Sequence, residues 1–403
     1  MAPVTSRSGL AARQWAVGLA GYCCFINLYS PQAILPLLSV EFGAGPAEIA
    51  HIITASTLAV ALTAPFTGSA ADTVGRKRII VAAMFLLTVP TVMVALAADL
   101  QAVVFWRFIQ GLVLPAIFTV TIAYIGEEWP REEATAAAGI YTSGASFGGF
   151  SGRFIAGIVT DLSDWRMAFF VLAAMTLIGA FAVALLLPRE RKFVRSEGIV
   201  QSLRQMLRHF RNGQLVATYA VGFGVLFNFI ATFTYVSFLL AGPPYNLSPT
   251  WLAIIFVTYL TGVTLTPWVG VAVTHYGRRR FMIRVLAAWL VGAILLLVPS
   301  IWAIVAGLAL CAGCGLLTQA VSTGYVTITA KAGKSSAVGL YVTSFYIGGA
   351  FGAALGGLAW VWAGWVACVA LVGAMLAVMA AIIWFVWTRR VPPSPEAPPV
   401  SAS

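Results

Sequence analysis

Apolar stretches long enough to cross a membrane run along almost all of this 403-residue chain. A hydrocarbon core about 30 Å thick requires about 20 apolar residues per helix. Twelve such stretches lie between the charged clusters, at residues 14–38, 48–69, 79–97, 102–126, 134–159, 166–188, 214–240, 249–271, 281–300, 301–325, 336–361 and 365–387. Because 60% of the residues are hydrophobic and only 9% are charged, an ordinary soluble domain is excluded. We therefore predict an all-α membrane protein with twelve transmembrane helices.

The basic residues predict which side of the membrane each loop faces. When alternate loops are assigned to alternate sides, 21 of the 24 Lys and Arg fall on one side, and only Arg107, Arg153 and Arg166 remain. Because Lys and Arg are retained in cytoplasmic loops, both termini are predicted to be cytoplasmic. The net charge of +11 then reflects topology and contact with the lipid bilayer, so no nucleic-acid partner is expected.

The chain contains an internal duplication. A shift of 200 positions aligns a set of identical residues in the two halves: Ala137, Gly139, Tyr141, Gly148, Gly149, Gly152, Gly157 and Trp165 with Ala337, Gly339, Tyr341, Gly348, Gly349, Gly352, Gly357 and Trp365. A shift of 202 aligns GSAADTVGRKR, residues 68–78, with GVAVTHYGRRR, residues 270–280. Such repeats allow transporters to build a site near the bilayer midplane and to open it alternately to either side.

A polar stretch near the middle of the chain separates the two copies. We predict two pseudo-symmetric six-helix bundles joined by a cytoplasmic linker and flanked by a cytoplasmic N-terminal segment and a disordered cytoplasmic tail. The predicted boundaries are 1–13 for the N-terminal segment, 14–188 for the first bundle, 189–213 for the linker, 214–387 for the second bundle and 388–403 for the tail.

Charged residues of the first loop copy are candidates for a conformational switch. Asp72 lies four residues before Arg76, a spacing that allows the two side chains to pair. Glu127 and Glu128, at the inner end of the fourth helix, are alternative partners. Ion pairs of this kind can latch one conformation and break in another. The alternative interpretation is that these charges only set the topology.

Two arginines are placed inside apolar helices, where a charge is costly and normally faces a cavity or a partner. Arg107 lies about one turn inside the fourth helix, followed by Gln110, and Arg153 lies two-thirds along the fifth. Both are candidates for proton coupling or substrate binding. The alternative is that each side chain extends to the outer surface while its stem stays in the membrane.

Acidic residues are distributed unevenly. No Asp or Glu occurs between Gly198 and Pro395, so any proton-carrying carboxylate must belong to the first half. The acids of that half are predicted to lie at helix ends rather than at mid-membrane. His51 is a further candidate, because histidine exchanges protons readily near neutral pH; alternatively it is an ordinary interfacial residue.

Polar and aromatic residues of the first and seventh helices are candidates for the wall of a substrate cavity. They are Asn27, Tyr29, Gln32, Phe223, Phe227 and Asn228. An apolar cavity with a few polar groups suits amphiphilic cations or neutral drugs, although such aromatics also commonly face lipid. The five cysteines lie inside apolar spans, so neither a metal site nor another cofactor is expected.

Three motifs resemble those of the major facilitator superfamily. GSAADTVGRKR resembles its signature loop, and Arg107, Gln110 and Gly111 resemble the RxxQG motif of the drug:proton antiporter branch, where it is associated with proton transfer. GASFGG, residues 144–149, resembles GPxxGG, with Ala145 where that pattern has Pro. With LYSPQAILP at 28–36, the chain is most similar to the YnfM-type, acriflavine-sensitivity branch. The glycines that carry the resemblance are Gly68, Gly75, Gly111, Gly144, Gly148 and Gly149.

The resemblance implies a secondary transporter of the bacterial inner membrane, acting as a monomer. It implies proton-coupled efflux of small amphiphilic or drug-like molecules by alternating access. A sugar or metabolite permease on the same fold is the alternative, and a non-transporting membrane sensor is a more distant one. Gly144, Ser146 and Gly148 also fit the GxSxG pattern of hydrolases, but this segment is predicted to be a transmembrane helix, so no enzyme activity is expected.

Overall fold

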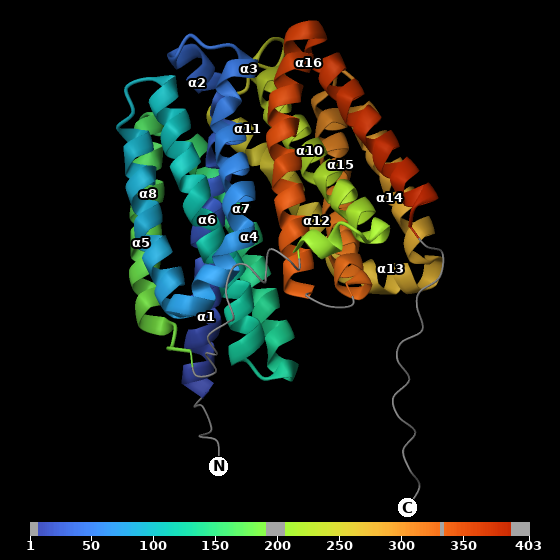
Figure 1. The fold of residues 1–403 in the computed structure, drawn as a ribbon. Coiled ribbons are helices and arrows are strands. Elements are labelled where there is room, and N and C mark those ends of the chain that lie inside the picture. The colour runs from blue at the N-terminus through green and yellow to red at the C-terminus, as the bar shows by residue number, and fades with distance from the viewer. Residues whose placement is uncertain (1–6, 191–205, 331–333, 388–403) are drawn as a thin grey trace, which may run out of the picture.

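The computed structural model describes residues 7–190, 206–330 and 334–387, which form helices and no strands (Figure 1). The predicted tail lies outside the described residues, as do residues 1–6 and most of the predicted linker. The first half consists of α1 (Arg7–Leu28), η1 (Ser30–Ala33), α2 (Leu35–Glu41), α3 (Pro46–Ile49), α4 (His51–Val74), α5 (Arg76–Ala95), α6 (Leu100–Glu128), α7 (Arg131–Leu162) and α8 (Trp165–Leu186).

The second half is also built of helices and short 3₁₀ turns. It consists of α10 (Gly213–Ala241), α11 (Pro249–Ile255), η2 (Phe256–Thr258), α12 (Tyr259–Leu265), η3 (Thr266–Trp268), α13 (Val269–Tyr276), α14 (Arg278–Leu295), α15 (Ile301–Thr329) and α16 (Lys334–Phe385). α16 is two helices in one, because Ala363 and Gly364 have non-helical backbone angles. Gly364 has a φ of +64°, which glycine adopts without steric cost.

The twelve predicted stretches correspond to helices of the structure. Eight segments of the described residues are long and apolar enough to cross a membrane, and one of them, Ser336–Phe385, contains the break in α16 and so supplies two crossings. The three remaining crossings are α1 together with α2, α7, and α14. α1 packs against α7 and α8, α7 also packs against α8, and α14 packs against α15. The predicted fold, two six-helix bundles, is confirmed.

Two predicted helices are interrupted in the structure. The first, predicted as continuous over 14–38, begins at Arg7 and breaks after Leu28 into the 3₁₀ turn η1. Pro31 lies in that turn, and proline lacks the N–H that a continuous helix needs. The eighth helix, predicted over 249–271, contains two 3₁₀ turns, η2 and η3, the second of which includes Pro267.

Glycines of the duplicated segment bring paired helices into close contact in both halves. A Cβ atom on Gly148 of α7 would overlap the Tyr22 carbonyl oxygen of α1, and one on Gly348 of α16 would overlap the Phe223 carbonyl oxygen of α10. Small residues allow such close approach of helix backbones. The duplication found in the sequence is therefore a duplication of one helix–helix contact.

The two halves meet where α4 packs against α16 and, in addition, at the outer side of the bundle. We call inner the side that holds Arg7, Gly75 and Gly277, following the predicted orientation. At the outer side α7 packs against α11, and α3 packs against α16 (Figure 1). The Asp161 carboxylate near the end of α7 accepts hydrogen bonds from Ser248 Oγ at 2.8 Å and from Thr250 N at 2.9 Å. The outer ends of the halves are thus held together.

Candidate functional site

Arg107 is fully buried and binds the broken end of α1. Its Nη1 donates hydrogen bonds to the Asn27 carbonyl oxygen at 2.8 Å and to Gln110 Oε1 at 2.6 Å. Its Nη2 donates to the Leu28 carbonyl oxygen and, at 3.2 Å, to Ser56 Oγ. Carbonyl groups at a helix C-terminus have no partner inside the helix and carry partial negative charge. The guanidinium therefore does not extend to the surface: it caps a helix end inside the membrane.

A chain of neutral hydrogen bonds continues from Arg107 through the first half. Gln110 Nε2 donates to Thr91 Oγ1 at 2.7 Å, and Thr91 Oγ1 donates to Asn27 Oδ1 at 3.1 Å. Asn27 Nδ2 in turn donates to Thr176 Oγ1 at 2.8 Å. The amide of Asn27, a predicted cavity residue, is thus occupied by α5 and α8 in this structure, and its contact with substrate stays a prediction.

Arg153 lies in an aromatic cage that both halves build. Its guanidinium carbon is 5.0 Å from the ring centre of Tyr29, 4.7 Å from that of Phe256 and 4.9 Å from that of Tyr259. The side chain is 2% exposed. Nη1 donates to the Gly149 carbonyl oxygen of its own helix at 2.5 Å. Ring faces attract a cation, so the cage partly replaces the solvent that Arg153 has lost.

Gln32 joins the Arg153 cage to the second half. Its Oε1 accepts hydrogen bonds from Arg153 Nε at 2.8 Å and Nη2 at 2.6 Å. Its Nε2 donates to Thr234 Oγ1 of α10 at 3.1 Å. Gln32 is 0% exposed and lies in η1, whereas Phe256 lies in η2. The cage therefore stands between one 3₁₀ interruption from each half.

No carboxylate pairs with either arginine among the residues that the structure describes. Every Asp and Glu there lies outside the helices or within three residues of a helix end. Arg107 and Arg153, by contrast, lie seven and nine residues from the nearest end of α6 and α7. The centre of the first half is consequently cationic.

The duplicated loops form tight turns at the inner side. Gly75 has a φ of +104° and Gly277 one of +76°, conformations that favour glycine. Arg76 is buried and forms an ion pair with Glu127, whose side chain is 46% exposed. The environments of Gly68 and Asp72 lie outside what the structure describes, although both residues belong to α4.

Other residues near these loops complete the inner side. The carbonyl oxygen of Glu128 accepts a hydrogen bond from Arg13 Nη2 at 3.3 Å. Glu190, which the sequence analysis did not single out, accepts one from the Lys77 backbone N–H at 3.3 Å. A carboxylate at this position is favourable, because α5 begins here and a helix N-terminus carries partial positive charge.

Two of the three predicted cavity residues of α10, Phe223 and Phe227, belong to an aromatic cluster in the second half. The half-buried ring of Phe223 stacks with Phe227 at 6.0 Å between centroids and lies 5.7 Å from Phe351. Asn228 is buried, and its Nδ2 contacts Met379 Sδ at 3.6 Å, while its Oδ1 has no hydrogen-bond partner among the described residues. A role in substrate binding stays a prediction for these three.

The remaining signature glycines lie at helix contacts or beside Arg153, whereas His51 is exposed. Gly111 lets α6 approach α4, because a Cβ there would overlap the Ser56 carbonyl oxygen. A Cβ on Gly144 would likewise overlap the Gly18 carbonyl oxygen of α1. Gly149 instead contributes its carbonyl oxygen to Arg153. His51 is exposed at the outer start of α4. The described residues contain no cluster of metal-ligating side chains.

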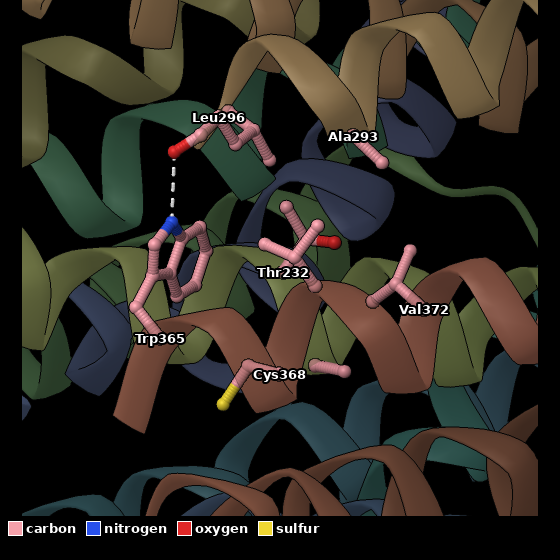
Figure 2. Close-up of a pocket in the computed structure, with 8 residues that line it drawn as sticks. Thr232, Ala293, Leu296, Trp365, Cys368 and Val372 are labelled. Atoms are coloured by element: carbon pink, nitrogen blue, oxygen red, sulfur yellow. Dashed lines mark hydrogen bonds between the residues drawn. The ribbon is translucent and has the colours of Figure 1, made fainter. Parts of the chain in front are cut away.

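Two cavities lie away from Arg107 and Arg153. A pocket in the second half, between α10, α14 and α16, has no room for a water molecule, and Trp365 Nε1 on its wall donates to the Leu296 carbonyl oxygen at 2.8 Å (Figure 2). It is a gap in apolar packing around Thr232 and Cys368. A larger cavity of about 750 Å³ opens at the outer side and is lined by both halves.

Sequence reasoning missed Phe256 and Tyr259, which complete the Arg153 cage from the second half, and Thr234 of α10, which accepts the hydrogen bond from Gln32. No motif marks them, because they belong to ordinary apolar stretches. The position of Phe256 and Tyr259 beside Arg153 follows from the packing of α7 against α11 and η2. No local pattern predicts the 3₁₀ turn at Phe256.

Comparison with known proteins agrees with this architecture. The model of the Major Facilitator Superfamily matches residues 17–267 and 221–403. An "Uncharacterized transporter" of Buchnera aphidicola is 28% identical over 86% of this chain and 84% of its own. The "Inner membrane transport protein YnfM" of Escherichia coli is 32% identical over 86% of this chain and 83% of its own.

A solved structure shares the fold. A mutant form of the nucleoside transporter NupG superposes with a TM-score of 0.76 at 14% identity, covering 92% of this chain and 98% of that one. Identity this low supports the fold alone. Twelve helices in two repeated halves, the duplicated glycine contacts and the family model lead to one conclusion. This chain is a membrane transporter that belongs to the major facilitator superfamily.

Proposed function

We propose that this transporter exports small amphiphilic or drug-like molecules in exchange for protons, by alternating access. It would act as a monomer in the bacterial inner membrane, with both termini in the cytoplasm, and would leave its substrate chemically unchanged. The proposal rests first on the membership of the superfamily. It rests further on the RxxQG residues, because Arg107 and Gln110 occupy the buried centre of the first half.

The observation that carries the proposal is the position of the Arg153 cage. Transporter sites lie near the bilayer midplane, between the repeats, where helices are discontinuous. The cage has the last two of these features, since η1 and η2 both contribute to it and Gln32 reaches from one half to the other. Its polar contacts tie the halves together at the side we call outer, where release of an exported substrate would require them to separate.

Dye efflux from energised cells tests this function. Cells that express the protein are loaded with lipophilic dyes of positive, neutral and negative charge, and retention is compared with cells that carry the empty vector. Export predicts lower retention of at least one dye and loss of the difference when an uncoupler dissipates the proton gradient. Equal retention of all dyes, with or without the uncoupler, would contradict the proposal.

Purified protein in proteoliposomes separates coupling from indirect effects in cells. An imposed pH gradient should drive accumulation of the exported dye, and dye movement should in turn collapse a pre-formed gradient. Transport that is independent of the gradient would show facilitated diffusion, and would remove the proton from the mechanism while leaving a transporter.

A further inference from the structure

The core of the first half holds two positive charges and no negative one among the residues that the structure describes. Arg107 and Arg153 are 0% and 2% exposed, and neither has a carboxylate partner there. Buried cations normally pair with anions, because desolvation of an unpaired charge is costly. Arg107 has a substitute in the carbonyl groups of Asn27 and Leu28. Arg153 has no helix end to bind.

A neutral amide occupies the donors of Arg153 that would bind an anion. Gln32 Oε1 accepts both Nε–H and Nη2–H of Arg153, the two donors that commonly bind a carboxylate side by side. A neutral amide therefore occupies the position of a counterion. A negatively charged group would form stronger hydrogen bonds with the same donors.

The surroundings of Arg153 suit an amphiphilic ligand. Three ring faces, from Tyr29, Phe256 and Tyr259, cover the guanidinium. They offer apolar surface beside the charge, as ligand pockets generally do around a few polar groups. A cationic ligand would meet an unneutralised positive charge at this place and would be repelled.

We propose that Arg153 binds the anionic group, such as a carboxylate, of an amphiphilic substrate; this inference rests on the proposed export function. The sequence alone favoured amphiphilic cations or neutral drugs. The burial of two arginines that have no carboxylate partner among the described residues reverses that preference. The anion replaces Gln32 at Arg153. Because Gln32 also donates to Thr234 across the halves, displacement of its oxygen from Arg153 loosens the contact that holds the outer side closed.

Matched ligands that differ only in charge test the charge preference. Several aromatic bodies, naphthalene and biphenyl among them, are each used as the carboxylate, the neutral amide and the aminomethyl cation. Thermal stabilisation and binding are measured on purified full-length protein in nanodiscs. The carboxylate is expected to bind about tenfold or more tightly than its amide, because hydrogen bonds to charged groups are the stronger kind. Preference for the amide or the cation, or no binding by any carboxylate, would overturn the inference.

Variants place the effect at Arg153. Gln32→Glu supplies an internal counterion, so it should preserve or raise the melting temperature without ligand and weaken carboxylate binding by about tenfold. Arg153→Gln should abolish the difference between carboxylate and amide. Arg166→Gln, which removes a half-exposed arginine at the outer surface, is the control and should keep that difference. A carboxylate preference that survives Arg153→Gln in folded protein would contradict the assignment.

The outcome is distinguishable from failure of the proposed function. If dyes are exported but cationic ones are preferred, export stands and the anion site falls. If carboxylates bind at Arg153 while no dye or carboxylate moves with the proton gradient, the site stands and proton-coupled export falls.

Discussion

Arg153 of α7 donates two hydrogen bonds, at 2.8 and 2.6 Å, to the single side-chain oxygen of Gln32 in η1. The nitrogen of the same amide donates to Thr234 of the second half at 3.1 Å. One side chain thus holds a buried charge and joins the two halves. The proposed alternating access requires the outer ends to separate, so it predicts that this contact breaks in each cycle.

Arg107→Ala is expected to abolish active export while the protein remains folded. The substitution leaves the buried Leu28 carbonyl oxygen without its guanidinium donor, whereas the Asn27 carbonyl oxygen keeps the hydrogen bond from Ser30 Oγ at 3.1 Å. An unsatisfied buried group costs about 1–3 kcal/mol. The melting temperature should therefore fall, and Arg107→Lys should recover part of it by restoring a charged donor. Wild-type export by folded Arg107→Ala protein would remove Arg107 from the mechanism.

Two glycines of α7 should respond differently to alanine. At Gly152 a Cβ would overlap the Ile26 carbonyl oxygen within the first half, whereas at Gly157 it would lie 2.5 Å from the Pro249 carbonyl oxygen of the second half. Overpacking costs about 1–3 kcal/mol. Gly152→Ala should lower the melting temperature, and Gly157→Ala should mainly favour the outer-open state. Gly139→Ala, in open space, is the control; equal effects at all three positions would contradict this distinction.

Asp161→Ala should weaken outer closure, because Asp161 accepts hydrogen bonds from Ser248 and Thr250 of the second half. The site is exposed, so the expected shift is modest, about threefold in the ratio of closed to open protein. Asp164→Ala is the matched control: Asp164 Oδ1 accepts from Met167 N at 2.7 Å within the first half. It should lower the stability of α8 without moving that ratio.

Asp72→Asn should slow the transport cycle, following the prediction that the first loop copy works as a switch. The structure describes one ion pair of this loop, between Arg76 and Glu127. Glu127→Gln is therefore expected to change turnover in the same direction and also to lower stability, since it removes a charged partner of the buried Arg76. Unchanged turnover in both variants would mean that the loop sets topology only.

Much of the fold could be predicted from the sequence, because apolar length, basic loops and repeated glycines each reflect one strong constraint. The break after Leu28 was not predicted, since apolar composition continues through Pro31 and Pro36. Arg107 and Arg153 were identified by the cost of a charge in an apolar helix. Their partners were not, because carbonyl oxygens at a helix end carry no side-chain signal.

The residues that the second half of the chain contributes to the site could not be predicted from the sequence, for a related reason. Thr234 and Phe256 differ from their apolar surroundings only by what packs against them, and that packing joins residues about a hundred positions apart or more. Gln32 was identified as a cavity residue, but its two roles depend on the bend of η1, which aims its amide between α7 and α10.

The outer gate can be measured directly as a distance between spin labels at Leu162→Cys and Trp251→Cys, which are exposed at the outer ends of the two halves. The five native cysteines are buried and are replaced for this purpose. In nanodiscs, we expect mainly short distances with native Gln32 and a larger population of long distances with Gln32→Ala. The exposed control Gln101→Ala should match native Gln32. Identical distributions with and without Gln32 would contradict a gate built on this residue.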